Sequence, residues 1–269
     1  MRINTNLNGM IATNQMAKNT ALAGNSMEKL STGLRITKAG DDAAGLAVSE
    51  KMRAQIRGME QAERNVQDGI SMVQTAEGAL EEAGNIAQRM RELGIQAGND
   101  TLDTKDREKI KAELKQLKEE MGNISVETKF NGNALLDGTK ATFTIQAGAN
   151  KETRTIDMAN LSSIANAIST IDIANAKAAQ TFVGEIDTAL EAITKARANL
   201  GAMQNRLEAT SSNLSTSTEN LTAAESRIRD VDVAKEMVKL SKLNILTQAS
   251  QAMVSQAKQQ PEQVTQLLR

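Results

Sequence analysis

Residues 182–228 read FVGEIDTALEAITKARANLGAMQNRLEATSSNLSTSTENLTAAESRI. Fourteen positions recur here at alternating spacings of four and three residues, and twelve are apolar, the exceptions being Thr210 and Ser217. The apolar positions are Phe182, Ile186, Ala189, Ile193, Ala196, Leu200, Met203, Leu207, Leu214, Leu221, Ala224 and Ile228. A strict period of 3.5 residues keeps one narrow stripe facing a partner helix, as in a coiled coil. At about 1.5 Å per residue the stripe is roughly 70 Å long, which predicts a helical rod.

The composition argues against catalysis. The chain has no His, Cys, Trp or Tyr and only three Phe. Without imidazole or thiolate it lacks the usual general base, the usual nucleophile and the commonest zinc ligands. The adjacent carboxylates Asp41 and Asp42 more often cap a helix than hold a metal. We therefore expect no enzyme activity, no metal and no cofactor.

Charge and hydropathy exclude two classes of partner. The net charge of -1 does not favour a nucleic acid, which is held by neutralising phosphates. No stretch approaches the roughly 18 consecutive apolar residues of a membrane span, so we expect no membrane. The first residues, MRINTNLNGMIATNQ, lack the apolar segment of a Sec-type signal peptide.

Two further helices repeat the apolar pattern. A stripe through residues 44–97 predicts a second long helix, and a charge-rich third helix follows a stop at Gly98 and Asn99, with Asp103 or Thr104 as its cap. The stripe of the second helix comprises Met52, Ile56, Met59, Val66, Ile70, Val73, Leu80, Ala83, Ala87 and Met90. That of the third comprises Ile110, Leu114, Leu117, Met121 and Ile124.

The periodicity changes after the third helix. The segment FNGNALLDGTK is rich in turn residues, and ATFTIQAGANKETRTIDM alternates in two short runs around residues 148–151, which predicts a β-hairpin. We therefore expect a mainly α fold: a long antiparallel helical bundle or coiled-coil rod with one β-hairpin, plus paired N- and C-terminal helical arms.

The two ends carry apolar stripes of their own. Ile3, Leu7, Met10, Ala17 and Ala21 form one stripe, and Ala23, Met27, Leu30 and Leu34 a second. At the other end the stripe is Val231, Ala234, Val238, Ile245, Ala249 and Ala252. Paired arms can bury only a narrow stripe, which leaves Met16, Leu22, Leu240, Leu243, Leu246, Met253 and Val254 in need of other partners. Isolated arms are marginal, so we expect them to be ordered by assembly into a filament or a ring, or to pair as a modest coiled coil in a monomer or dimer.

Six ordered segments carry a resemblance to a known family. They are EKLSTGLRITKAGDDAAGLAVSEKMRAQIRG (28–58), QRMRELGIQAGN (88–99), FNGNALLDG (130–138), LGAMQNRLE (200–208), NLTAAESRIRDVDVAKEM (220–237) and the terminal QQPEQVTQLLR. Together they closely resemble bacterial flagellin. The likeness covers nearly the whole chain, and only residues 139–180 fall where flagellins vary. The large outer domains that many flagellins insert there are absent.

The resemblance implies a subunit that self-assembles into the helical filament of the bacterial flagellum and serves motility. Paired arms, 1–38 and 231–269, would line the filament core, and a helical rod, 39–138 and 175–230, would surround it. A connector at 35–46 would join them, with the β-hairpin and a minimal variable region at 139–174. The expected contacts in the filament core are Ile3, Leu7, Met10, Ile11, Leu22, Met27, Leu30, Val238, Leu243, Ile245, Leu246, Met253, Val254, Leu267 and Leu268.

The same resemblance implies several partners and a location. Family members are exported unfolded through the flagellar type III channel, and an export chaperone binds the C-terminal arm. Junction and cap proteins bind the assembled filament, which is extracellular. A host toll-like receptor recognises the QRxREL motif, so the candidate contacts are Gln88, Arg89, Leu93 and Glu113. Gly94 stands where a helix former such as Ala is more usual.

Two other functions stay open at this point. A hook-filament junction protein would share the terminal patterns but would join filaments without elongating them. A cytoplasmic coiled-coil adaptor would stop at a small oligomer, whereas a filament subunit would polymerise on seeds.

Overall fold

The computed structural model describes residues 6–168 and 171–267, the last eight of these by their backbone only. In this part of the chain there are six helices and four short strands, so the mainly α prediction is confirmed. The chain divides into two compact units, each described by itself. Unit 1 comprises Met1–Ala54 and Asn220–Arg269, and unit 2 comprises Gln55–Glu219.

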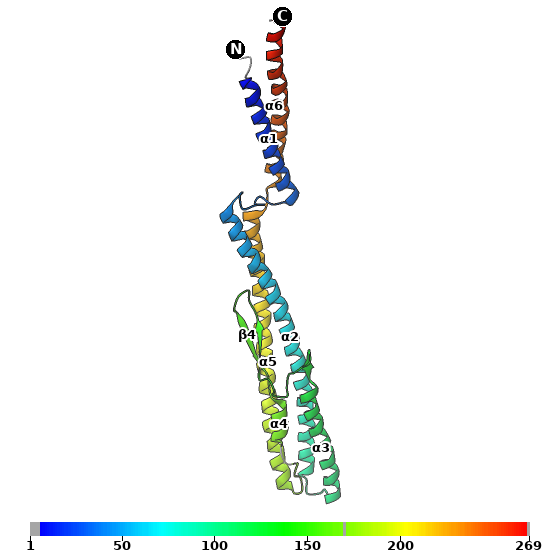
Figure 1. Ribbon diagram of the computed structural model, residues 1–269. Helices are drawn as coiled ribbons and strands as arrows, with labels where there is room; N and C mark the ends of the chain where they lie inside the picture. The colour runs from blue at the N-terminus through cyan, green and yellow to red at the C-terminus, as the bar shows by residue number, and fades with distance from the viewer. Residues whose placement is uncertain (1–5, 169–170, 268–269) are drawn as a thin grey trace. The chain divides into compact units, whose positions relative to one another are not determined.

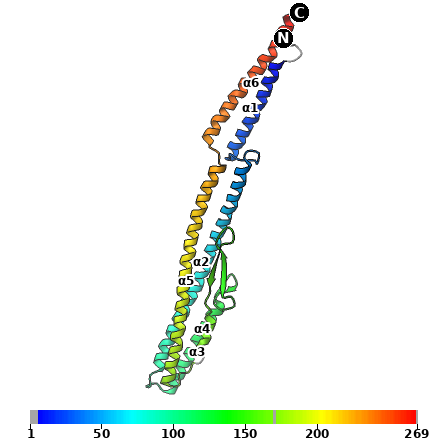
Figure 2. The ribbon, with the colours of Figure 1, turned by 90° about the vertical axis from the view of Figure 1, so that its left-hand side faces the viewer.

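The two longest helices match the two longest sequence patterns. Helix α2 runs over Ala43–Ala97 and helix α5 over Ala176–Arg229, so each extends through both units. Within unit 2 they lie side by side and antiparallel (Figures 1 and 2). Arg91 Nε, for example, lies 2.6 Å from the Asp187 carboxylate. All fourteen seam positions of α5 are buried or half-buried, which confirms the predicted stripe.

The core of unit 2 lies along this α2–α5 seam. The α2 side chains Val66, Val73, Leu80 and Met90 are completely buried. Across from them α5 contributes Phe182, Ile186, Ala189, Ile193, Leu200, Leu207 and Leu214. Burying a large apolar side chain contributes about 1.5–3 kcal/mol, so this seam supplies the principal drive for folding unit 2.

Helix α3 (Thr104–Glu127) adds a third layer to unit 2. Asp103 caps it by accepting a hydrogen bond from the Thr104 backbone N–H, as one of the two predicted caps. Leu114 and Met121 are completely buried. The short helix α4 (Leu161–Ala167) packs on α3, and the Lys118 ammonium donates to the Ile168 carbonyl at 2.6 Å.

Unit 2 carries two β-hairpins where the sequence predicted one. Strands β3 (Thr142–Gln146) and β4 (Thr153–Asp157) form the expected antiparallel pair. A smaller pair, β1 (Lys129–Phe130) and β2 (Asn133–Ala134), was not expected. Its two-residue turn places Asn131 at φ 49° and Gly132 at φ 80°. Asn-Gly is the preferred sequence of such a turn, so the signal lay inside a segment interpreted only as turn-rich.

The larger hairpin lies against α2 where glycines permit close approach. A Cβ on Gly58 would stand 3.1 Å from the Cα of Ala149, and a Cβ on Gly69 would overlap the Ile145 side chain. Between them the Asn65 amide donates to the Gln146 carbonyl at 3.3 Å. These glycines lower the helix propensity of α2. They are needed nonetheless, because the hairpin occupies the space that a side chain would fill.

Unit 1 is built from the two ends of the chain. Helix α1 (Leu7–Thr32) and helix α6 (Val233–Leu267) run antiparallel along each other, blue beside red in Figure 1. Helix α1 ends at Gly33, whose φ of 72° is the left-handed conformation that glycine adopts without strain. A backbone bridge then joins Leu34 to Asp230. The predicted pairing of the terminal segments is therefore confirmed.

Candidate assembly surface in the terminal helices

The face that α1 turns toward α6 is unusually small and polar. Between residues 9 and 27, every buried or half-buried residue of α1 falls on one heptad stripe, and the same holds for α6 between residues 233 and 259. On α1 the stripe is Gly9, Ala12, Met16, Asn19, Ala23, Ser26 and, one position further, Leu30. On α6 it is Glu236, Leu240, Leu243, Thr247, Ser250, Val254 and Ala257. Six of these fourteen residues are glycine or polar.

The first α1 stripe and the α6 stripe that the sequence analysis assigned to the arms are therefore wrong as pairing faces, whereas Ala23 and Leu30 of the second α1 stripe lie in the seam. Of the first α1 stripe, Leu7, Met10, Ala17 and Ala21 are exposed. On α6, Ala234, Val238, Ile245, Ala249 and Ala252 are exposed as well. Met16, Leu240, Leu243 and Val254, expected to need other partners, instead lie in the seam. Two stripes of equal period run along each helix, and periodicity does not identify the one that faces the intramolecular partner.

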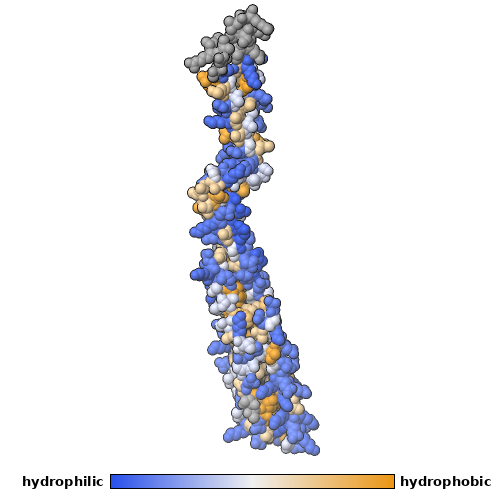
Figure 3. Space-filling view, viewed as in Figure 1, coloured by the Kyte–Doolittle hydropathy of each residue, from blue (hydrophilic) through white to orange (hydrophobic). Residues whose placement is uncertain are grey.

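The consequence is a row of large apolar side chains on the outside of unit 1. Nine of the predicted filament-core residues are exposed, at between 39% and 72% of their full surface. They are Leu7, Met10, Ile11, Leu22, Met27, Val238, Ile245, Leu246 and Met253. Figure 3 shows hydrophobic patches among the hydrophilic side chains on the visible face of α1 and α6. Large apolar side chains that are exposed in such number indicate an interaction surface.

The other predicted core residues occupy different places. Leu30 and Val254 are half-buried and Leu243 is 7% exposed, so these three hold α1 and α6 together. Ile3 and Leu268 lie outside the described residues, as does the side chain of Leu267. Val233 and Met237, which were not predicted, are 56% and 54% exposed. They lie on the first turns of α6, whose register the sequence analysis assigned to the wrong stripe.

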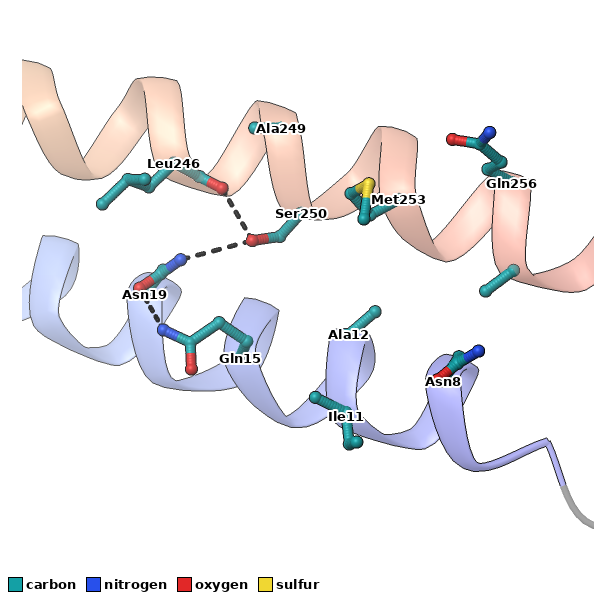
Figure 4. A pocket seen from close by; sticks show the side chains of 11 residues that line it. Asn8, Ile11, Ala12, Gln15, Asn19, Leu246, Ala249, Ser250, Met253 and Gln256 are labelled. Atoms are coloured by element: carbon teal, nitrogen blue, oxygen red, sulfur yellow. Dashed lines mark hydrogen bonds between the residues drawn. The ribbon is translucent and has the colours of Figure 1, made fainter.

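A groove of about 530 Å³ runs between the two helices on one side. Figure 4 shows its floor, where Asn19 and Ser250 face each other, and its apolar walls, formed by Ile11, Leu246 and Met253. The Asn19 amide donates to the Ser250 hydroxyl at 3.3 Å, and the Gln15 amide donates to the Asn19 carbonyl oxygen at 3.4 Å. The groove is therefore apolar along its rim and polar at its base.

The predicted connector, 35–46, is fixed by backbone and carboxylate contacts within unit 1. The Arg35 N–H donates to the Arg229 carbonyl at 2.7 Å, and the Ile36 side chain is 1% exposed. Of the two candidate capping residues, Asp42 caps α2, and Asp41 instead holds the loop before it. Asp42 accepts from the Gly45 N–H at the start of α2, and Asp41 accepts from the backbone N–H groups of Thr37 and Lys38.

Three carboxylates of unit 1 are stabilised in their charged form. The Thr37 and Lys38 N–H groups lower the pKa of Asp41, and the Lys235 N–H lowers that of Asp232. The Ser26 hydroxyl, followed by the Lys239 ammonium, lowers the pKa of Glu236. Hydrogen bonds to a carboxylate favour its ionised form, so these contacts depend on pH.

Three of the four candidate receptor residues gather on the surface of unit 2. Gln88, Arg89 and Glu113 are exposed. The Arg89 guanidinium donates to Glu113 at 3.0 Å and to Glu92 at 3.1 Å, and these carboxylates raise its pKa. Leu93 is only 2% exposed. It packs in the core of unit 2, so we no longer expect it to contact a receptor directly.

Gly94 has a packing reason for its place beside that motif. A Cβ on Gly94 would stand 2.9 Å from Val183 Cγ2 and 3.1 Å from the Phe182 ring. Real Cβ atoms essentially never approach another heavy atom within 3.0 Å. The close approach of α5 explains why a better helix former is not used here.

Within residues 6–168 and 171–267, no group of three or more His, Cys, Asp or Glu side chains is placed to hold a metal ion. In the same ranges no helix has the length and apolarity needed to cross a membrane.

Comparison with known proteins agrees with this architecture. Residues 3–141 match the family model of the bacterial flagellin N-terminal helical region, and residues 183–268 match that of the C-terminal helical region. A flagellin of Halalkalibacterium halodurans is 54% identical over 272 residues, and that of Bacillus subtilis is 46% identical over 304, each alignment spanning both chains completely. The crystal structure of Bacillus cereus flagellin superposes with a TM-score of 0.53 at 34% identity, covering 60% of this chain and 94% of that one.

Proposed function

The chain belongs to the bacterial flagellin family, and from that premise we propose that the outward apolar face of α1 and α6 is its filament-forming surface. The chain is a structural subunit that self-assembles into the extracellular filament of the bacterial flagellum and serves motility. The hook-filament junction protein and the cytoplasmic adaptor are not favoured. We assign the chain no catalytic role, since the family is one of structural proteins.

One observation carries the proposal: more than half of the seam positions between α1 and α6 are small or polar, while nine large apolar side chains of the same helices are exposed. A monomer gains nothing from an exposed Ile245 or Val238, at 63% and 72% of their full surface. Each such side chain would contribute about 1.5–3 kcal/mol if a neighbouring subunit covered it. Nine of them supply a contact that only assembly completes.

A matched pair of substitutions tests this surface. Ile245→Asp places a charge on the outward face, and the neighbouring Asn244→Asp places the same charge on an exposed polar residue of the same helix. We expect Ile245→Asp to abolish seeded polymerisation, observed by electron microscopy and light scattering, and Asn244→Asp to polymerise. Equal polymerisation of both variants, with helix content unchanged by circular dichroism, would contradict the proposal.

We assign the segments of the chain to different parts of the filament. Residues 1–38 and 231–269 form the inner arms, and 39–138 with 175–230 form the surrounding rod, joined by the connector 35–46. Residues 139–174 carry the hairpin and the minimal variable region. Removing about thirty residues from each end should leave unit 2 folded and unable to polymerise, because its apolar seam is complete without the arms.

The outward face of α6 also suits a chaperone that shields it before export. Val238, Ile245 and Met253 are exposed along it, and an exposed apolar surface of this kind aggregates unless it is covered. Unfolded export through the type III channel, and contacts of the arms with cap and junction proteins, complete the proposed partners.

The surface cluster of unit 2 is a second proposed contact. Gln88, Arg89 and Glu113 are candidates for recognition by a host toll-like receptor, because they are exposed together and joined by the Arg89–Glu113 ion pair. Exposed ion pairs contribute about 0–1 kcal/mol to stability, so Arg89→Ala should leave the fold intact. Receptor signalling by the monomer should fall in a reporter-cell assay, and unchanged signalling would remove Arg89 from the contact.

A further inference from the structure

The contact between Asn19 and Ser250 is unusual within the seam of α1 and α6. Asn19 is 4% exposed and faces the Ser250 hydroxyl at 3.3 Å, while the Ser250 hydroxyl donates to the Leu246 carbonyl at 2.7 Å. Figure 4 shows the three groups in one chain of hydrogen bonds. A buried amide of this kind must keep a polar partner. Its position along the opposing helix is therefore restricted.

Near the connector the backbone bridge between Leu34 and Asp230 holds the two ends of the chain together, and Ser26 of α1 acts on Glu236 at the start of α6. Beyond these contacts, the seam offers little to fix the position of α1 along α6. On α1, Gly9, Ala12 and Ala23 present small side chains that fit many alignments equally well. The other interhelical hydrogen bond near the end of the pair runs from the Asn6 amide to the Ala257 carbonyl, and a backbone carbonyl recurs at every residue. Asn19 and Ser250 instead pair through their side chains, so the hydrogen bond between them is lost when either helix slides.

A slide by one heptad illustrates the difference. Moving α6 by seven residues, about 10 Å along its axis, replaces Ser250 opposite Asn19 with Leu243 or Ala257, the stripe members one heptad away on either side. Neither side chain can pair with the amide. A single polar seam residue is known to select one register among otherwise similar coiled-coil alignments.

The same contact also opposes rotation of the helices. If α1 turned about its axis to bring its larger apolar stripe inward, Asn19 would leave Ser250, and Leu7 and Met10 would be buried within the monomer. The pair would bury more apolar surface, and the outward face would lose the side chains that reach a neighbour. The polar seam therefore keeps the apolar side chains available for assembly.

We propose that Asn19, paired with Ser250, is a specificity-determining residue for filament assembly, because it sets the register and the rotation of α1 against α6. The proposal rests on the filament-forming surface described above. It assigns to a buried polar pair a role in presenting the outward face, in addition to any contribution to stability.

The test uses the full chain with three variants. Asn19→Leu removes the polar contact, and the exchange Asn19→Ser with Ser250→Asn restores a polar pair in the same two positions. Ile245→Asp is the reference for the outward face itself. Since the chain has no cysteine, Asn14→Cys and Gln248→Cys can carry spin labels on exposed polar positions of α1 and α6.

We expect Asn19→Leu to keep or raise the unfolding temperature while slowing seeded elongation by about tenfold, equivalent to about 1.4 kcal/mol. Its distance distribution should gain a second population, as expected if α6 slides by about 10 Å along its axis. The exchanged pair should return both the single distance and the elongation rate to wild-type values.

Two results would overturn the proposal. Normal elongation of Asn19→Leu with one unchanged distance would show that register does not depend on this pair. Slow elongation accompanied by lost helix content, or an exchanged pair that does not recover, would reduce Asn19 to a packing residue. If Asn19→Leu elongates normally while Ile245→Asp does not, only this inference fails. If Ile245→Asp also polymerises, the filament-forming surface fails with it.

Discussion

The two helix pairs of this chain differ in how much of their apolar surface they bury. Along the α2–α5 seam of unit 2, Val66, Leu80 and Ile186 are completely buried, and the polar side chains face outward. Along the α1–α6 seam of unit 1, Ser26 and Asn19 are buried while Met10 and Ile245 are exposed. The first pair satisfies its apolar surface within one molecule, whereas the second leaves its apolar surface for other copies. The burial of the apolar side chains, more than their period, distinguishes a helix pair that is complete within one molecule from one that other copies complete.

The largest effect that tests this comparison is truncation of matched leucines. Leu80→Ala removes a completely buried side chain and should lower the free energy of unfolding by about 2–5 kcal/mol. Leu22→Ala removes one that is 47% exposed, and its effect on the soluble chain should stay within about 0.5 kcal/mol. Urea unfolding followed by circular dichroism measures both. Equal losses would erase the distinction between the two seams.

A second, smaller effect on stability comes from replacing two glycines of α2 within unit 2. Gly58→Ala would press a methyl group on the backbone of Ala149 and should destabilise the chain by about 1–3 kcal/mol. Gly78 has no neighbour within 4 Å, so Gly78→Ala should stabilise it by about 0.5–1 kcal/mol. Thermal unfolding compares the two. Stabilisation by both substitutions would mean that the hairpin does not lie tightly on α2.

The smallest effect concerns pH and the connector of unit 1. The pKa of Asp41 is lowered in the folded chain from an ordinary value of 3.8. The unfolded chain therefore takes up a proton first on acidification, so the stability that this carboxylate contributes is complete above its unfolded pKa and is lost as the pH falls further. Asp41→Asn should lower the unfolding temperature at about pH 7, and this deficit should shrink as the pH falls below the ordinary value of 3.8 towards the lowered pKa of the folded chain. A deficit that persisted undiminished in acid would assign the effect to packing.

Much of the fold could be predicted from the sequence because its helices are long and strongly periodic. The second helix was predicted over 44–97, and α2 runs over Ala43–Ala97. Of the two residues predicted as possible caps of α3, Asp103 is the one that caps it. The hairpin around residues 148–151 also matches β3 and β4. In each case local propensity and tertiary packing favour the same structure.

The site was harder to predict, since its outcome depends on which of two equivalent stripes faces a partner. The most apolar stripe of α1, with Leu7 and Met10, was assigned to the intramolecular pair, and it is exposed. The polar seam residues Asn19 and Ser250 lie in no apolar stripe, so the sequence analysis did not identify them. Leu93 was placed on a surface by its motif, but α2 turns it into the core. The period of the apolar residues alone predicts neither the exposure of the first α1 stripe nor the burial of Leu93.

The central claim is that other copies of the chain cover the apolar face that unit 1 leaves exposed. The absence of native cysteine allows one direct measurement, the rate at which a thiol reagent labels Ile245→Cys in the soluble chain and in seeded filaments, with the urea-unfolded chain as the fully accessible reference. The account predicts labelling near the reference rate in the soluble chain and strong protection in the filament. Equal labelling rates in the two states would contradict it.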